Sequence, residues 1–207
     1  MSAIQGNGKA VQHPIKVPVM HHVNLKTIRL QEMIDWYSNV VGCKVMFQNA
    51  DIAFISNDAA NHRIALVYSP LFTDDPARRV HTGIHHTAFE YASVDDLLQT
   101  WVRLKDEQTL PHMALDHGFT LSFYYVDPDG NSVELQADWF GDWAESGKYL
   151  NGSPEFARNP IGVFVDPAGL LAARESGKSI QELHRMGYSG EVPPTTPPDL
   201  RFDVPQP

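Results

Sequence analysis

Two histidine pairs occupy equivalent places in two matching segments of this chain. His21 and His22 begin the first segment, and His85 and His86 begin the second, 64 residues later. After each pair the apolar residues change from a two-residue period to a helical period at the same point, which is typical of a duplicated strand–helix unit. The duplication places one histidine of each pair at the same position on two facing strands. Two facing imidazoles and one carboxylate can together bind a metal ion.

The carboxylate is expected from the last strand of the second unit, predicted over residues 132–137. In this stretch Val133 and Leu135 share one face, whereas Glu134 lies on the other face between polar neighbours. The same alternation assigns the second histidine of each pair to the polar, concave side and the first to the side that packs under the helices. A concave side with imidazoles and a carboxylate suits chemistry better than packing.

A face of two histidines and one carboxylate with open coordination positions is the usual signature of a non-haem Fe(II) oxygenase. We expect His22, His86 and Glu134 to be the three ligands. A lone histidine is more often a structural polar group than a ligand. Here two histidines hold the same place in a repeat and the glutamate faces the same cleft, and this combination favours a metal site.

The elements that must position these residues form two units of the order strand–helix–strand–strand–strand. We expect an α+β fold in which the two units close into one curved, partly closed mixed β-sheet with both helices outside. The tail is predicted to hold short helices around residues 168–176 and 179–186, and its Pro-rich stretch to be an extended arm. The expected divisions are an N-terminal arm at 1–16, a first module at 17–70, a second module at 83–138, and a C-terminal tail at 139–207.

Composition limits the classes of partner. The formal net charge is −9, which argues against nucleic acid and anionic membranes as partners. Cys43 is the single cysteine, so an internal disulfide is excluded and a reducing compartment is favoured. The N-terminus has no basic-then-apolar signal pattern, and no apolar run approaches the roughly 20 residues that span a bilayer. These features predict a cytoplasmic protein.

The paired units at about 17–138 and the motif SFYYVDPDGNSVEL at Ser122–Leu135 resemble the vicinal oxygen chelate superfamily. That superfamily includes glyoxalase I, bleomycin-resistance proteins and type I extradiol dioxygenases, which cleave catechols. The last-strand motif is most similar to the dioxygenases. Most of those enzymes have an additional N-terminal pair of units, and this chain resembles the smaller, one-domain members.

The resemblance implies a role for each of several residues. It implies Fe(II), or Mn(II) in some members, bound by the three ligands already named. It implies an acid–base role for His62, at the head of the strand that reads HRIAL, and a substrate hydrogen bond from Tyr124, ten residues before Glu134. His117 matches a further active-site histidine, with His112 as a local competitor, although the spacing from His117 to Tyr124 is two residues shorter than usual.

The implied function is extradiol ring cleavage of a catechol-type aromatic diol, biaryl diols included, by O2. The partners would be the diol, O2 and further copies of the chain. A second reading is another metal-dependent member of the superfamily, such as an epimerase, a glyoxalase or a fosfomycin-modifying enzyme. A third reading is a metal-free protein that binds aromatic drugs. Retention of both histidines and the glutamate argues against the third reading, and His62 with Tyr124 favours the dioxygenase over the second.

Overall fold

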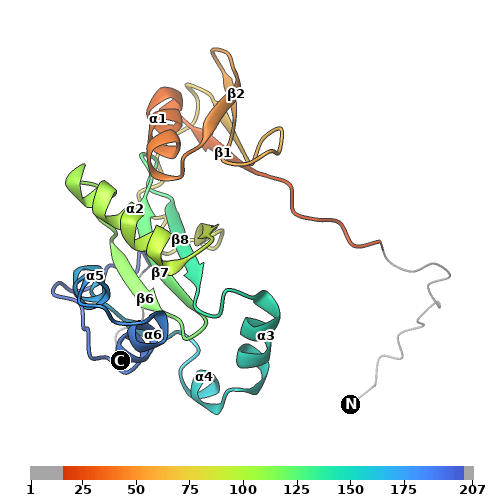
Figure 1. Ribbon diagram of the computed structural model, residues 1–207. Coiled ribbons are helices and arrows are strands. Elements are labelled where there is room, and N and C mark those ends of the chain that lie inside the picture. Colours follow the sequence, from red (N-terminus) through yellow and green to blue (C-terminus); the bar gives the residue numbers. More distant parts are fainter. Residues whose placement is uncertain (1–15, 203–207) are drawn as a thin grey trace, which may run out of the picture.

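The structure, a computed structural model, describes residues 16–202 (Figure 1). Nearly all of the expected N-terminal arm, and the last five residues of the tail, lie outside the described residues. Two units follow one another in the order that the sequence predicts. The first unit consists of β1 (Val23–Thr27), α1 (Leu30–Val40), β2 (Lys44–Gln48), β3 (Ile52–Ser56) and β4 (Ile64–Tyr68). The second consists of β5 (His86–Tyr91), α2 (Val94–Asp106), β6 (Met113–Asp116), β7 (Thr120–Val126) and β8 (Ser132–Asp138).

The two units have the same sheet topology, which confirms the duplication. In the first unit the strands are ordered β1-β4-β3-β2, and in the second β5-β8-β7-β6. In both, the first strand pairs in parallel with the last strand, and the other pairs are antiparallel. The head strands β1 and β5 therefore occupy the same place in their sheets, each at a sheet edge.

Burial of one helical face explains why α1 and α2 cover these sheets. In α1 the buried side chains are Met33, Ile34, Tyr37 and Val40, which recur three or four residues apart. Helix α2 begins at the cap of Ser93, whose hydroxyl accepts a hydrogen bond from the amide of Asp96, and it buries five residues: Val94, Leu97, Leu98, Trp101 and Leu104. Each helix thus covers one apolar side of its own sheet.

The α+β class is confirmed, but the sheets remain separate and neither is closed. The units share buried apolar contacts, such as that of Val133 with the core under α1, and polar contacts between the region of α1 and the turn before β8. The hydroxyl of Tyr37 donates to Asp127 at 3.2 Å, and the guanidinium of Arg29 donates to Asp129 at 2.8 Å. Hydrogen bonds along a sheet edge would be needed to join β1 to β5, and both strands pair only within their own sheets.

A C-terminal segment packs on the second unit (Figure 1). Its elements are α3 (Trp143–Gly152), α4 (Pro154–Arg158), β9 (Val163–Phe164), α5 (Pro167–Glu175) and α6 (Ile180–Tyr188). The last two helices lie where the sequence predicts them. Helices α3 and α4 were not predicted, because between them they bury one residue, Ser146, and depend instead on caps from Asp142 and Ser153. Strand β9 extends the second sheet by pairing with β6.

No helix within residues 16–202 is both long enough and apolar enough to cross a membrane.

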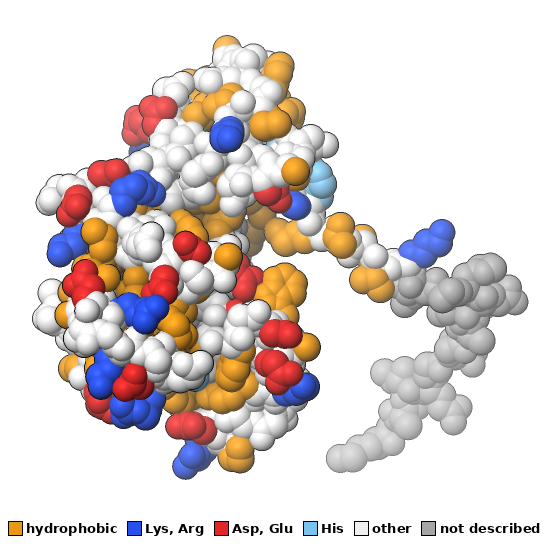
Figure 2. Space-filling model, in the orientation of Figure 1, with side chains coloured by type: hydrophobic (Ala, Val, Ile, Leu, Met, Phe, Trp, Pro, Cys, Tyr) orange, Lys and Arg blue, Asp and Glu red, His pale blue; other side chains and the backbone are white. Residues whose placement is uncertain are grey.

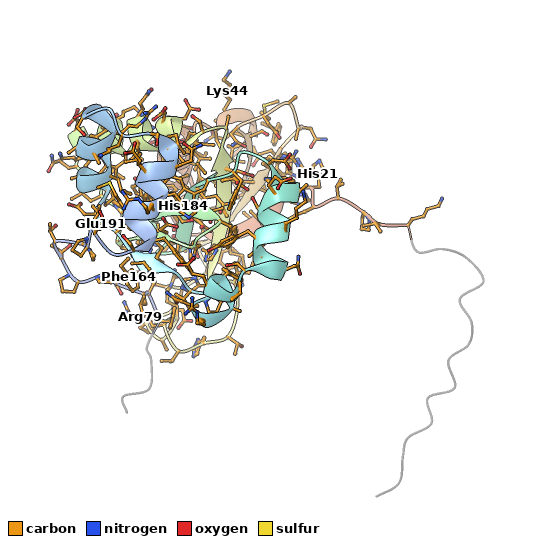
Figure 3. The ribbon with its side chains drawn as sticks, turned by 60° about the horizontal axis from the view of Figure 1, so that its bottom comes forward. His21, Lys44, Arg79, Phe164, His184 and Glu191 are labelled. Atoms are coloured by element: carbon orange, nitrogen blue, oxygen red, sulfur yellow. The ribbon has the colours of Figure 1, made fainter. Side chains whose placement is uncertain are left out.

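The C-terminal segment buries a carboxyl group at the end of β6. Asp116 is fully buried, and its Oδ1 accepts hydrogen bonds from the amide of Gly118 at 2.8 Å and from the indole of Trp139 at 3.0 Å. Its Oδ2 has no hydrogen-bond partner among the described residues. Figure 3 shows His184 of α6 within the C-terminal segment, and its imidazole stacks on Trp139. Burial raises the pKa of Asp116 to about 7.

This raised pKa makes stability depend on pH. The folded chain holds the proton of Asp116 more tightly than the unfolded chain, where the pKa is about 4. The stabilising effect of that proton is therefore complete below about pH 4 and is lost as the pH rises to about 7. We expect the free energy of unfolding of the natural chain, relative to that of Asp116→Asn, to fall by about 1–4 kcal/mol across this window.

Denaturant unfolding at several pH values would measure the difference. Asp95→Asn is the matched control, since a hydrogen bond from Arg174 lowers the pKa of Asp95 and the sign of its effect is opposite. Equal pH slopes for the natural chain and Asp116→Asn would contradict the prediction.

Candidate active site

Alternation along β7 and β8 sends two functional side chains to the same side of the second sheet. Phe123 and Leu135 are fully buried in the core under α2, and they face each other across the two strands. Their neighbours Tyr124 and Glu134 also face each other, on the opposite side of the sheet. This is the orientation that the sequence predicts for Glu134.

Glu134 is buried beside His86. Its Oε2 lies 3.0 Å from Nε2 of His86, and its side chain is 6% exposed. Burial alone would raise the pKa of Glu134, but hydrogen bonds from His86, Ser122 and Tyr124 hold that pKa below its usual value. The group is therefore a carboxylate at neutral pH. A buried carboxylate and an imidazole nitrogen are both good ligands for a divalent metal ion.

The spacing of these two atoms also fits a shared metal ion. Ligand atoms at right angles about one ion, each about 2.1 Å from it, lie about 3.0 Å apart. The nitrogen of His86 and the oxygen of Glu134 are at that separation. The second unit therefore presents two of the three expected ligands at a distance that a metal ion can bridge.

A series of close polar contacts continues from Glu134 to the C-terminal segment. The hydroxyl of Tyr124 donates to Oε1 of Glu134 at 3.0 Å, and Nε2 of His117 lies 2.9 Å from that hydroxyl. Nδ1 of His117 then lies 2.6 Å from the carbonyl oxygen of Ile161. Burial lowers the pKa of His117 and raises the pKa of Tyr124, so both are neutral at pH 7. The shorter spacing between His117 and Tyr124 does not prevent their contact.

His112, the competing histidine, has another place in the structure. One ring nitrogen lies 2.5 Å from the carbonyl oxygen of Asp199 and the other 3.0 Å from the hydroxyl of Ser132. It ties the end of the chain to the start of β8.

The first unit holds a second group of histidines. His21, His22 and His62 place ligand atoms within 4.8 Å of one another, and the rings of His22 and His62 have centroids 4.4 Å apart. His62 also stacks on Phe54 at 4.7 Å. Burial, followed by the neighbouring imidazoles of His22 and His21, lowers the pKa of His62. His62 therefore stays neutral and can accept a proton near pH 7.

The structure brings His22 and His86 to one cavity but not to one coordination sphere. Both line a cavity of about 590 Å³ between the two units. Among the described residues, the group whose potential ligand atoms all lie within 4.8 Å of one another is the three-histidine group of the first unit, and it contains neither His86 nor Glu134. The reason is that His22 precedes β1 and His86 begins β5, and these strands belong to separate sheets.

One expectation about the histidine pairs was wrong. His21 and His85 do not pack under the helices but are exposed, because β1 and β5 begin only at Val23 and His86 and so neither residue lies in a strand. His21 instead contacts His62 edge to face. The repeated histidine pairs in the sequence could have indicated that His21 belongs to the histidine group.

Two further features escaped sequence reasoning. The carbonyl of Ile161 contacts His117 through the backbone, for which no residue type is a signal. Trp143 donates its indole N–H to both carboxylate oxygens of Glu90, at 2.9 and 3.0 Å, although the indole is largely exposed. Glu90 lines the cavity between the units and also a smaller cavity of about 350 Å³ beside Trp143.

Comparisons with known proteins identify the family of this chain. The family model of the Glyoxalase/Bleomycin resistance protein/Dioxygenase superfamily matches residues 19–135. Two relatives come from Rhodococcus globerulus. Biphenyl-2,3-diol 1,2-dioxygenase 2 is 37% identical over 87% of this chain and 94% of its own length. Biphenyl-2,3-diol 1,2-dioxygenase 3 is 37% identical over 80% of this chain and 87% of its own length.

Among solved structures, a glyoxalase/bleomycin resistance protein/dioxygenase from Nocardioides has a TM-score of 0.48 and 17% identity, over 60% of this chain and 86% of that one. The family match spans more than half of the chain, and the two Rhodococcus relatives cover most of it. This chain therefore belongs to the Glyoxalase/Bleomycin resistance protein/Dioxygenase superfamily.

Proposed function

We propose that this chain is a metal-dependent extradiol dioxygenase that uses O2 to cleave the ring of a catechol-type diol, with biaryl diols as its preferred substrates. The observation that carries the proposal is the series of close contacts from His86, which lines the cavity between the units, through the buried Glu134 and Tyr124 to His117. The expected enzyme class, an aromatic ring-cleavage dioxygenase, is confirmed by the relatives. The substrate and the metal are part of the proposal.

His22, His86 and Glu134 are the residues that we propose to hold the metal ion, Fe(II) first and Mn(II) as the second choice. His86 and Glu134 lie at a distance suited to one ion, and His22 lines the same cavity as His86. A divalent ion at this place would lower the pKa of the diol hydroxyls and bring diol and O2 together.

The chain's own residues would manage the protons. We propose that neutral His62 accepts a proton from one diol hydroxyl and later returns it to a departing oxygen. The hydroxyl of Tyr124 would hydrogen-bond a substrate oxygen, since it stands beside Glu134 on the same side of the sheet. His117 would support Tyr124 from the other side.

Trp143 suits the second ring of a biaryl diol. His86, Ala88 and Glu90 share one face of β5, and Ala88 is the neighbour of Glu134 across the strand pair. Glu90 is four residues beyond His86, which is about 13 Å along the strand. It holds the exposed indole of Trp143 at the end of the ligand face. An aromatic ring that extends from the diol along β5 would point toward this indole.

Association of several copies remains a prediction. Strand β2 is an edge strand whose five residues are all exposed, and Val45, Met46 and Phe47 are each about half exposed. In Figure 2, hydrophobic side chains gather on the surface of the upper part of the molecule. An apolar edge strand of this kind is typical of a surface that pairs with another chain.

Removal of a ligand is expected to remove the metal. We expect His22→Ala, His86→Ala and Glu134→Ala to lose bound iron and ring cleavage while the chain stays folded. Iron content and oxygen uptake on catechol and on biphenyl-2,3-diol are the measurements. His81→Ala is the matched control, because His81 is exposed, pairs with Asp75 and is not one of the proposed ligands. Full iron content in any of the three ligand variants would show that the ligand set is wrong.

Loss of the proposed acid–base group is expected to slow turnover without loss of metal. In His62→Gln we expect kcat to fall by about 10²–10⁴-fold with unchanged iron content, because proton transfer is lost and no ligand is removed. Anaerobic diol binding should persist and is measured by the change in absorbance of the bound diol. An unchanged kcat would remove the proposed role.

Loss of the exposed indole is expected to affect biaryl diols alone. Trp143→Ala should raise KM for biphenyl-2,3-diol about 10-fold, the equivalent of one aromatic contact, and leave KM for catechol unchanged. Trp143→Phe, which keeps an aromatic ring, should retain most of the preference. Equal changes for both diols would contradict the assignment of Trp143 to the second ring.

A further inference from the structure

A turn of the C-terminal segment approaches the end of β6 unusually closely. Strand β9 pairs with β6 so that Val163 stands opposite Asp116, which brings Gly162 against His117. Gly162 has a φ of +97°, and a Cβ on it would overlap the carbonyl oxygen of Asp116 and lie 2.7 Å from Cα of His117. Glycine is therefore required here both for its backbone conformation and for its lack of a side chain.

Asn159 holds this turn in place. Its side-chain amide donates to the carbonyl of Gly162 at 2.8 Å, and its Oδ1 accepts from the amide of Gly162 at 3.3 Å. Its own amide caps the end of α4. The carbonyl of Ile161, between these residues, is left to face His117.

The contact with Ile161 determines which nitrogen of His117 carries the proton. A carbonyl oxygen can only accept a hydrogen bond, so Nδ1 of His117, 2.6 Å away, must be the donor. In the neutral imidazole Nε2 then has a free lone pair, and Nε2 is the atom that faces the hydroxyl of Tyr124 at 2.9 Å. In the other tautomer the Nδ1 lone pair would face a carbonyl lone pair.

A count of protons shows what this tautomer does. Tyr124 has one hydroxyl proton and two acceptors within reach, Nε2 of His117 and Oε1 of Glu134. In the Nδ1–H tautomer Nε2 can accept this proton, so that both contacts of His117 then join a donor to an acceptor. Nε2 is thus a proton acceptor directly beside the residue expected to contact the diol.

We infer that the turn at Ile161 and Gly162 is a positioning element of the active site, which fixes His117 as the Nδ1–H tautomer so that Nε2 faces Tyr124. Ile161 acts through its backbone carbonyl and Gly162 through the close approach that it permits. The catalytic consequence rests on the proposed function, whereas the tautomer itself does not.

Nitrogen-15 NMR of the imidazoles tests the inference, because the correlations between ring nitrogens and ring protons differ between the two tautomers. The full chain is measured as purified and again with Zn²⁺, a diamagnetic ion that takes the same ligands. The signal of His117 is assigned by its absence from His117→Asn. We expect the Nδ1–H tautomer in both samples. The Nε2–H tautomer in the natural chain would overturn the inference.

Gly162→Ala tests the positioning role. We expect a mixture of tautomers at His117 and a 10- to 100-fold lower kcat on biphenyl-2,3-diol, with unchanged metal content and little change in KM. Ile161→Ala is the matched control, since it keeps the carbonyl and removes only a largely exposed side chain. Gly147→Ala controls for the added methyl group, because a Cβ there meets nothing within 4 Å.

A pure Nδ1–H signal with unchanged kcat in Gly162→Ala would overturn the positioning role. Should that variant not fold, the tautomer in the natural chain still decides the inference. If the natural chain shows the Nδ1–H tautomer but cleaves no diol, the positioning element stands and the proposed function fails.

Discussion

Burial of Phe123 and Leu135 under α2 is the constraint on which the proposed active site depends. Side chains alternate along a strand, so the two residues that enter the core force their neighbours Tyr124 and Glu134 to the opposite face. A shift of one residue in either strand would exchange the apolar and the polar side chains, at the cost of burying a carboxylate in the core. The register of β7 and β8 is thus held by hydrophobic burial, and the positions of Tyr124 and Glu134 follow from it.

A buried carboxylate is costly unless its environment satisfies it. The carboxylate of Glu134 on β8 contacts His86 on β5 and accepts a hydrogen bond from Tyr124 on β7, so its partners come from the two strands beside its own. Asp116 of β6, in the same sheet, is not compensated in this way. One of its oxygens has no partner among the described residues, and burial raises its pKa. The same sheet therefore keeps one carboxyl group ionised and makes the other readily protonated.

Local patterns predicted much of this arrangement. The period of apolar residues in α1, α2 and the strands was enough to find the duplicated units, and strand alternation was enough to orient Glu134. The faces of His21 and His85 were predicted wrongly because the alternation was extended past the ends of the strands. The separation of the two sheets and the contact from Ile161 depend on long-range packing and on a backbone carbonyl, neither of which a pattern of residue types encodes.

The pairing of β9 with β6 has a consequence for the order in which parts of the chain can fold during synthesis. The family match ends at residue 135, yet the partner of His117 is residue 161. Synthesis proceeds from the N-terminus, so both units can have emerged and begun to fold before their last hydrogen bond becomes available. A nascent or proteolytically shortened chain that stops before β9 would contain every residue of the family match and still lack the carbonyl group that faces His117.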